Sequence, residues 1–293
     1  DADGSDAGWQ GVNRQKQQMP IHNARLLQGA ARRTLAQNGY ELLMRPHSIE
    51  GIDFFNHAQV VKEYYPQCVE IVRAFTGGQV FAFDHNVRSA VGKQAKQRIA
   101  GGQQVQGPAT IVHGDYTLTS APQRLRDLTK PPKTNDTLRG VLQDGQSLIR
   151  AEEAERVLAD DGRFAIINLW RNIAKEPVFT NPLALCDAQT VSPEDLVVFE
   201  IQYQERIGEN YFAKHTPGHQ WFYYPHITRD EALLIKQWDS AGPLARSKGA
   251  KPDASDPQAP CTFSYHTAFE DPTTPPDAPD RWSIETRCFV LYD

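Results

Sequence analysis

The stretch TIVHGDYTLT, residues 110–119, places a histidine and an aspartate two residues apart. The run has the alternating apolar and β-branched character of a strand, in which successive side chains point to opposite faces. We therefore expect His113 and Asp115 to project from the same face. Such a pair either binds a metal or forms a hydrogen-bonded surface pair, and the short motif alone does not decide between the two.

A metal at this pair needs a further ligand from a later part of the chain. Two neutral imidazoles and one carboxylate form the facial triad of non-haem Fe(II) oxygenases, which leaves positions for a keto acid and dioxygen. The chain has nine histidines. We favour His266 as the third ligand, because it lies in the predicted strand 259–269 and is followed by Arg281 and Ser283.

The segment RWSIETR is a candidate site for the distal carboxylate of 2-oxoglutarate. A guanidinium pairs with a carboxylate in fork geometry, and a hydroxyl adds a hydrogen bond. Arg281 and Ser283 have this Arg-x-Ser spacing. In a regular strand Glu285 and Arg287 share their face. Arg287 is therefore the alternative carboxylate-binding residue, or else the partner of Glu285 in a buried salt bridge; we favour Arg281 because it is closer to His266 in sequence.

Aromatic side chains on the predicted strands are candidates for a substrate pocket, with core packing as the alternative for each. The candidates are Tyr116, Trp170, Tyr203 and Trp221, together with Arg171 beside Trp170. Asp84 and His85 imitate a metal pair, but adjacent residues on a strand point to opposite faces. We expect His85, His215 and His219 to be structural or exposed.

Composition favours a small-molecule ligand. The net charge of −5 and the pI near 6.0 provide no basic field for nucleic acid. No apolar run approaches the roughly 20 residues of a membrane span, and the N-terminus DADGSDAGWQ has no apolar signal-peptide core. These features predict a cytoplasmic protein without a nucleic-acid or membrane partner. The four cysteines never form a CxxC motif, and we expect buried thiols.

The order of predicted elements indicates a mainly β protein with flanking helices (α+β). Helices are expected at 22–39, 54–78 (divided by Pro66), 147–162 and 228–240, the last because Thr228 and Glu231 form a capping-box pattern. Strands are expected at 40–44, 79–89, 163–170, 195–206, 219–225, 259–269 and 281–292. This pattern favours a jelly roll over a doubly wound sheet.

We predict one domain over residues 21–293, with residues 1–20 disordered or extended. Within it, residues 21–108 form an α/β extension and residues 109–293 the jelly-roll core. No internal repeat is seen.

Several sequence blocks, taken in order, resemble the hydroxylase/desaturase family of fungal and bacterial specialised metabolism. They are VHGDYTLTSAPQRLRDL, RFAIINLWRNI, NPLALCDAQTVSPEDLV, HQWFYYPHITRDEALLIKQWDS, and YHTAF with RWSIETR. The family includes the fungal gibberellin desaturase and a component of bacterial cephamycin methoxylation. The resemblance implies an Fe(II)- and 2-oxoglutarate-dependent oxygenase on a double-stranded β-helix core, with iron ligands at His113, Asp115 and His266.

Two positions depart from the family pattern, Asn172 where proline is usual and His226 where methionine is usual. Two other classes stay open. A zinc hydrolase could use the same three ligands, although it has no need of an Arg-x-Ser carboxylate clamp. A cupin-like binding protein could keep the fold, although it should have a damaged triad or cosubstrate site.

Overall fold

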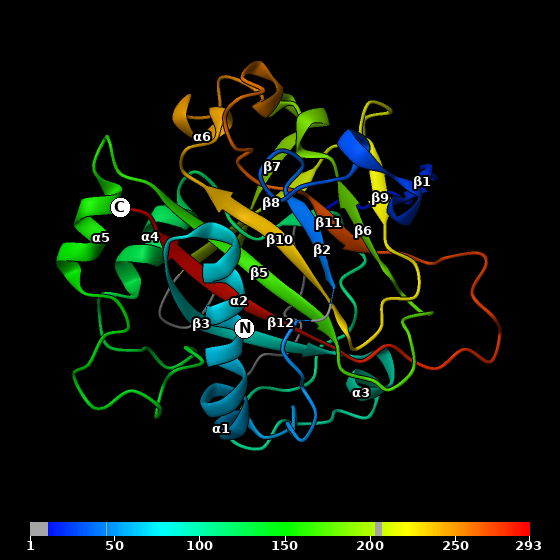
Figure 1. Cartoon of the computed structure of the whole chain (residues 1–293), viewed down its shortest axis with the longest axis horizontal. Coiled ribbons are helices and arrows are strands. Elements are labelled where there is room, and N and C mark those ends of the chain that lie inside the picture. Colours follow the sequence, from blue (N-terminus) through cyan, green and yellow to red (C-terminus); the bar gives the residue numbers. More distant parts are fainter. Residues whose placement is uncertain (1–10, 45, 203–206) are drawn as a thin grey trace.

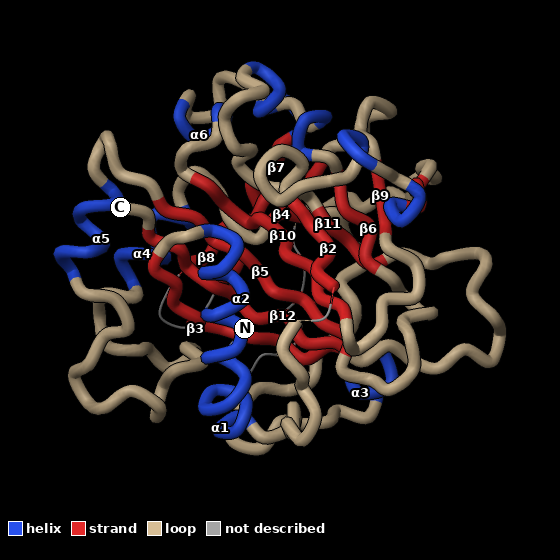
Figure 2. The backbone as a smooth tube through the Cα atoms, viewed as in Figure 1, coloured by secondary structure: helices blue, strands red, loops and turns tan. Residues whose placement is uncertain are grey.

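The computed structural model describes residues 11–44, 46–202 and 207–293. Two β-sheets form the body of the molecule; one longer helix crosses the face of a sheet, and the other helices lie around the edge (Figure 2). The strand order is β2-β10-β5-β12-β3 in the five-stranded sheet and β1-β9-β6-β11-β4-β8-β7 in the seven-stranded sheet. The mainly β, jelly-roll class predicted from the sequence is confirmed.

The five-stranded sheet is antiparallel throughout. Its strands are β2 (Tyr40–Met44), β3 (Gln79–Arg88), β5 (Phe164–Asn172), β10 (Glu231–Asp239) and β12 (Ser283–Leu291). Every residue of β5 and β10 is buried, because these strands have neighbours on both sides and packed layers on both faces. The N-terminal strands β2 and β3 therefore complete the same sheet as the later strands.

The seven-stranded sheet is built from shorter strands. They are β1 (Ile21–Asn23), β4 (His113–Gly114), β6 (Leu183–Cys186), β7 (Leu196–Gln202), β8 (Ile207–Ala213), β9 (Trp221–Tyr223) and β11 (His266–Ala268). The edge strand β7 is half exposed. Two very short strands, β4 and β11, carry the histidines predicted to bind metal.

Helix α2 (Tyr65–Thr76) lies across the outer face of the five-stranded sheet and packs against β3 and β12 (Figure 1). It follows α1 (His57–Gln59) and a π-helical turn, Val60–Tyr64. Pro66 directly follows the π-helical turn, and because it has no N–H it cannot donate a backbone hydrogen bond to that turn. The helix predicted at 54–78 is found at residues 57–76; its irregular part is the π-helical turn Val60–Tyr64, and the helical residues continue through Pro66 without a break.

The other helices are short. They are α3 (Ala90–Gln94), α4 (Ser120–Asp127), α5 (Ala151–Leu158) and α6 (Pro243–Arg246). Single 3₁₀ turns occur at Ala24–Leu26, Gly29–Ala31, Ala188–Thr190, Pro193–Asp195 and Asp253–Ser255. In the part of the chain that the structure describes, no helix is long and apolar enough to cross a membrane.

Alternation along β12 separates the outer core from the space between the sheets. Ile284, Cys288 and Val290 belong to the cluster that also contains residues of α2. Phe289 and Leu291 belong to a different cluster, which includes side chains of the seven-stranded sheet. All four cysteines are buried and free, as predicted.

Two predicted helices are wrong. Residues 231–239 form the central strand β10; Glu231 does accept a hydrogen bond from the backbone N–H of Thr228 (2.9 Å), but the chain then runs extended. A strand buried on both faces is a nearly continuous apolar run, which imitates a helical period. Residues 22–39 form β1 and two 3₁₀ turns, and Leu26 is 75% exposed instead of lying on a buried helical face.

Candidate metal centre and cosubstrate site

His113, Asp115 and His266 meet between the two sheets, and each offers a ligand atom within 4.8 Å of the others. Asp115 Oδ1 lies 3.6 Å from His113 Nε2 and 4.0 Å from His266 Nε2. All three side chains are at most 10% exposed. The same-face placement expected for His113 and Asp115 is therefore observed, although the regular strand there covers only His113 and Gly114.

Strand register brings the two histidines together from positions far apart in the chain. His266 of β11 pairs directly with His113 of β4, and the ring centroids are 4.3 Å apart. Cross-strand partners share a face. Nδ1 of His113 bonds the carbonyl oxygen of Ile111 at 2.8 Å, so that nitrogen carries the proton and Nε2 keeps its lone pair toward the cluster.

The protonation states suit a cation. Burial, reinforced by the neighbouring His266, lowers the pKa of His113 to about 4, and burial also lowers the pKa of His266. Burial alone would raise the pKa of Asp115, but Arg287 and the two imidazoles hold it below its usual range. Two neutral imidazoles and one carboxylate at neutral pH are a donor set that fits a divalent ion.

Three side chains of the five-stranded sheet fix Asp115. Its Oδ2 accepts hydrogen bonds from Asn168 Nδ2 at 3.0 Å and Arg287 Nε at 3.2 Å. Its backbone N–H donates to Gln237 Oε1 at 3.1 Å. We did not predict Asn168 and Gln237 from the sequence; the available signal was a polar residue inside each of two apolar central strands.

Arg281, two residues before β12, occupies a different environment. It is 2% exposed, and NH1 donates to the carbonyl oxygen of Asn181. Within the described ranges no acidic side chain pairs with it. Three buried polar atoms there have no hydrogen-bond partner among the described residues, namely Arg281 Nε, Ser283 Oγ and Trp170 Nε1. Burial and the charge of Arg88 lower the pKa of Arg281 to about 9.

Arg88 links this cationic corner to the histidines. Arg88 of β3 is the cross-strand partner of Ser283 of β12. The positive charge of Arg88 also lowers the pKa of His113 and of His266. Among the described residues no carboxylate forms an ion pair with Arg281, although Asp280 and Glu285 act on it from further away. Its unpartnered Nε and the hydroxyl of Ser283 are groups that could bind a carboxylate.

The structure does not bring every predicted residue to this cluster. Trp170 is there, with the guanidinium of Arg281 at 5.8 Å from its ring centre. Arg171, next to it on β5, donates to the carbonyl oxygens of His47 and Arg229, both at 2.7 Å. Tyr116 is buried in the core cluster around Phe83 and Leu125. Tyr203 lies outside the described residues.

Trp221 faces away from the candidate ligands. Leu185 pairs with both His266 and Phe222, so Phe222 shares the ligand face and its neighbour Trp221 lies on the other. Among the remaining histidines, His85 bonds Tyr65 (2.9 Å) and His219 bonds Asp195 (3.0 Å). His226 lies in a separate surface hollow.

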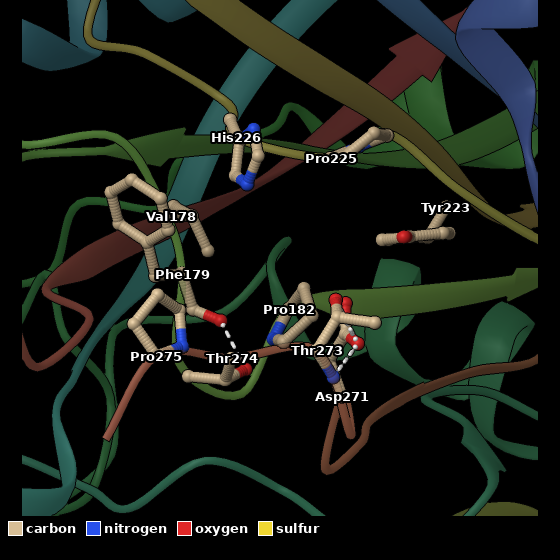
Figure 3. Close-up of a pocket in the computed structure, with 10 residues that line it drawn as sticks. All are labelled: Val178, Phe179, Pro182, Tyr223, Pro225, His226, Asp271, Thr273, Thr274 and Pro275. Atoms are coloured by element: carbon tan, nitrogen blue, oxygen red, sulfur yellow. Dashed lines mark hydrogen bonds between the residues drawn. The ribbon is translucent and has the colours of Figure 1, made fainter. Parts of the chain in front are cut away.

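That hollow is small and partly open to solvent (Figure 3). Phe179 and His226 line it on one side, Tyr223 lies on the opposite side, and the loop around Asp271 lies below them in the view of Figure 3. None of the three candidate ligands lines it. The wall that contains Phe179 continues to Thr180, whose hydroxyl accepts the backbone N–H of Arg281 at 2.9 Å, so the hollow adjoins the cationic corner.

Comparison with known proteins identifies the class. A family model described as an oxidoreductase/YMDC permease-like domain matches residues 2–291. The solved structure of the iron and alpha-ketoglutarate-dependent endoperoxidase NvfI is similar to this chain with a TM-score of 0.70 and 25% sequence identity, over 93% of this chain and 84% of that one.

Two curated sequences extend the comparison. An uncharacterised protein from the dcmA 3' region of Methylophilus leisingeri is 40% identical over 174 residues, which cover 59% of this chain and 79% of that protein. The hydroxylase/desaturase poxK of Penicillium oxalicum is 34% identical over 166 residues, which cover 48% of this chain and 46% of that one. The chain thus spans about half the length of poxK.

The chain therefore belongs to this oxidoreductase family, and the named members to which it is similar are iron- and 2-oxoglutarate-dependent oxygenases and hydroxylase/desaturases. The family resemblance noted in the sequence is confirmed.

Proposed function

We propose that the chain uses Fe(II), 2-oxoglutarate and dioxygen to hydroxylate or desaturate a small-molecule metabolite. The observation that carries this proposal is the buried His113, Asp115 and His266 cluster beside a cationic corner with orphaned donors. The named relatives support the same reaction class.

Each residue has a defined task in this proposal. His113, Asp115 and His266 hold the iron through Nε2, Oδ1 and Nε2. Arg281 binds the distal carboxylate of 2-oxoglutarate through its guanidinium, and the Ser283 hydroxyl adds a hydrogen bond. When bound, the iron with 2-oxoglutarate and dioxygen supplies the oxidising power for attack on a C–H bond, with succinate and carbon dioxide as products.

Burial of the site contributes to this chemistry. The cluster is shielded from solvent by the apolar layers between the sheets, so charges interact more strongly there than in water. Trp170 forms an aromatic wall beside Arg281. We propose a small apolar or zwitterionic substrate, because the chain is acidic overall and has no basic stripe for a polyanion.

A zinc hydrolase on the same ligands is less well supported. It would leave the donors of Arg281, Ser283 and Trp170 without a partner, since hydrolysis at zinc needs no keto acid. A cupin-like binding protein would likewise not need a three-ligand centre with a paired, fixed carboxylate. The named relatives favour neither class.

The test is 2-oxoglutarate turnover measured as succinate formation and oxygen consumption in the presence of Fe(II). We expect the wild-type chain to form succinate slowly without substrate and faster with the correct metabolite. His266→Ala should abolish both, whereas the control His215→Ala, at an exposed histidine outside the cluster, should not. Unchanged succinate formation by folded His266→Ala would refute the proposed site.

A further inference from the structure

Arg287 was one of two candidate carboxylate clamps in the sequence, and the geometry points to a different role. We infer that Arg287 is a positioning residue that fixes Asp115 as a metal ligand through one oxygen only. The inference rests on the proposed function, because it concerns the same metal site, but it assigns a task to a residue that would not itself touch metal or cosubstrate.

The first step is the orientation of the carboxylate. A carboxylate with two free oxygens can bind a cation through both. In this chain Oδ2 of Asp115 is held by Arg287 Nε (3.2 Å) and Asn168 Nδ2 (3.0 Å). Only Oδ1 faces the two histidine Nε2 atoms, at 3.6 Å and 4.0 Å. Single-oxygen binding would occupy one coordination position and leave the others for the keto acid and dioxygen.

The second step is that Arg287 is itself held rigidly. Its NH1 donates to Asp84 Oδ2 at 2.9 Å and to Asn86 Oδ1 at 2.6 Å, and its NH2 donates to Glu285 Oε1 at 3.3 Å. Asp84 is fixed in turn by the hydroxyl of Thr137. With the bond to Asp115, four of the five N–H donors of the guanidinium are in use, so it cannot offer a fork to a second carboxylate.

The third step is charge. The three carboxylates bonded to Arg287, those of Asp84, Asp115 and Glu285, and the one guanidinium carry a formal charge of −2 together. A buried excess of negative charge is unfavourable, and a divalent cation neutralises it. Arg287 alone therefore orients Asp115 without neutralising all three carboxylates that it contacts.

The experiment measures metal binding instead of turnover. Co(II) is titrated into the metal-free chain, and both its dissociation constant and its visible d–d spectrum are recorded. Arg287→Gln should weaken Co(II) binding about 10- to 100-fold and shift the spectrum, since partners that orient a ligand have effects of this size. Arg287→Lys keeps the positive charge but lacks the several N–H donors of a guanidinium. It should recover part of the Co(II) affinity, with a spectrum that still differs from that of the wild type.

The matched control is Arg163→Gln. Arg163 forms a two-point pair with Asp239 (2.8 and 3.1 Å) away from the candidate ligands, so its loss should not move the Co(II) spectrum. If Arg287→Gln fails to fold, Asn168→Ala removes the other bond to Oδ2 and should shift the spectrum in the same way. Unchanged affinity and spectrum in a folded Arg287→Gln would overturn the inference about Arg287 but not the proposed function. No Co(II) binding by the wild-type chain would overturn the proposed function as well.

Discussion

Two arginines lie six residues apart at one end of the chain and occupy opposite environments. Arg287 touches the carboxylates of Asp84, Asp115 and Glu285. Arg281 touches a backbone carbonyl and an aromatic ring, and no carboxylate within the described residues pairs with it. Arg281 is 2% exposed and the side chain of Arg287 is 12% exposed, so the difference in burial is small beside the difference in partners.

The difference shows that the counter-ions around a buried cation indicate its role. A guanidinium already surrounded by carboxylates belongs to the structure, because its removal leaves those carboxylates unpaired. A guanidinium without a counter-ion is unfavourable unless a ligand supplies one. Arg281 is therefore the better candidate for an anionic cosubstrate, and the predictions below are ways to test that contrast.

The largest expected effect is on stability at Arg287. Arg287→Met should lower the free energy of unfolding by about 3–5 kcal/mol, because it leaves buried carboxylates without a counter-ion. Arg281→Met, which keeps a similar volume, should cost far less, since it leaves no carboxylate unpaired. Urea denaturation of the two variants measures the difference. Equal losses would show that the two environments are not electrostatically distinct.

The next effect is on cosubstrate binding at Arg281. Arg281→Met should weaken 2-oxoglutarate binding roughly 30- to 1000-fold, equivalent to about 2–4 kcal/mol, because a charged two-point contact is lost. Anaerobic calorimetry with Mn(II) as the metal measures this. Metal affinity should stay near the wild-type value. Tight 2-oxoglutarate binding by Arg281→Met would transfer the role to another cation, with Arg88 the first to test.

A smaller effect is expected at Ser283, whose buried hydroxyl oxygen has no partner among the described residues. Ser283→Ala should weaken 2-oxoglutarate binding about tenfold, the value of one hydrogen bond to a charged group. The same calorimetry applies. If the variant bound 2-oxoglutarate as tightly as wild type, the hydroxyl would have no part in the clamp.

The smallest effect is at a peripheral pair, Arg25 and Glu231, which are 2.7 Å apart. Burial alone would raise the pKa of Glu231, but the bonds from Arg25 and Thr228 lower it below its ordinary value. This contribution to stability is present above the ordinary glutamate pKa and is lost as the pH falls through the lower folded-state value. Arg25→Gln should therefore cost about 1 kcal/mol at pH 7 and almost nothing well below pH 4. A loss that does not change with pH would contradict this origin.

The sequence predicted the strands that carry the site better than the helices around it. Strands β5 and β12 lie close to their predicted bounds. Strand β10 was mistaken for a helix, because a capping-box pattern precedes it and a strand buried on both faces lacks the alternation that would have argued against a helix. Residues 22–39 were mistaken because their Leu and Ala spacing does not reveal that polar contacts, such as Arg33 to Asp187 at 3.2 Å, hold that segment.

Within the site, residues close in sequence were easier to predict than those brought together by register. The spacing of His113 and Asp115 was sufficient to place them on one face. Asn168 donates to Asp115 and Gln237 accepts its backbone N–H; both bonds depend on three strands meeting, and sequence spacing does not contain that information. The same applies to Arg287, whose contact with Asp115 spans 172 positions and is seen only in three dimensions.

The most direct test of the account is an anaerobic titration of the chain with Fe(II) and 2-oxoglutarate, followed by the weak visible charge-transfer band of the iron-bound keto acid. The account predicts a saturable band for the wild type and none for His266→Ala. Arg281→Met should need far more 2-oxoglutarate for the band, whereas Arg287→Gln should need more Fe(II) but a similar 2-oxoglutarate concentration. Absence of the band in the wild type, or the same band in His266→Ala, would contradict the account.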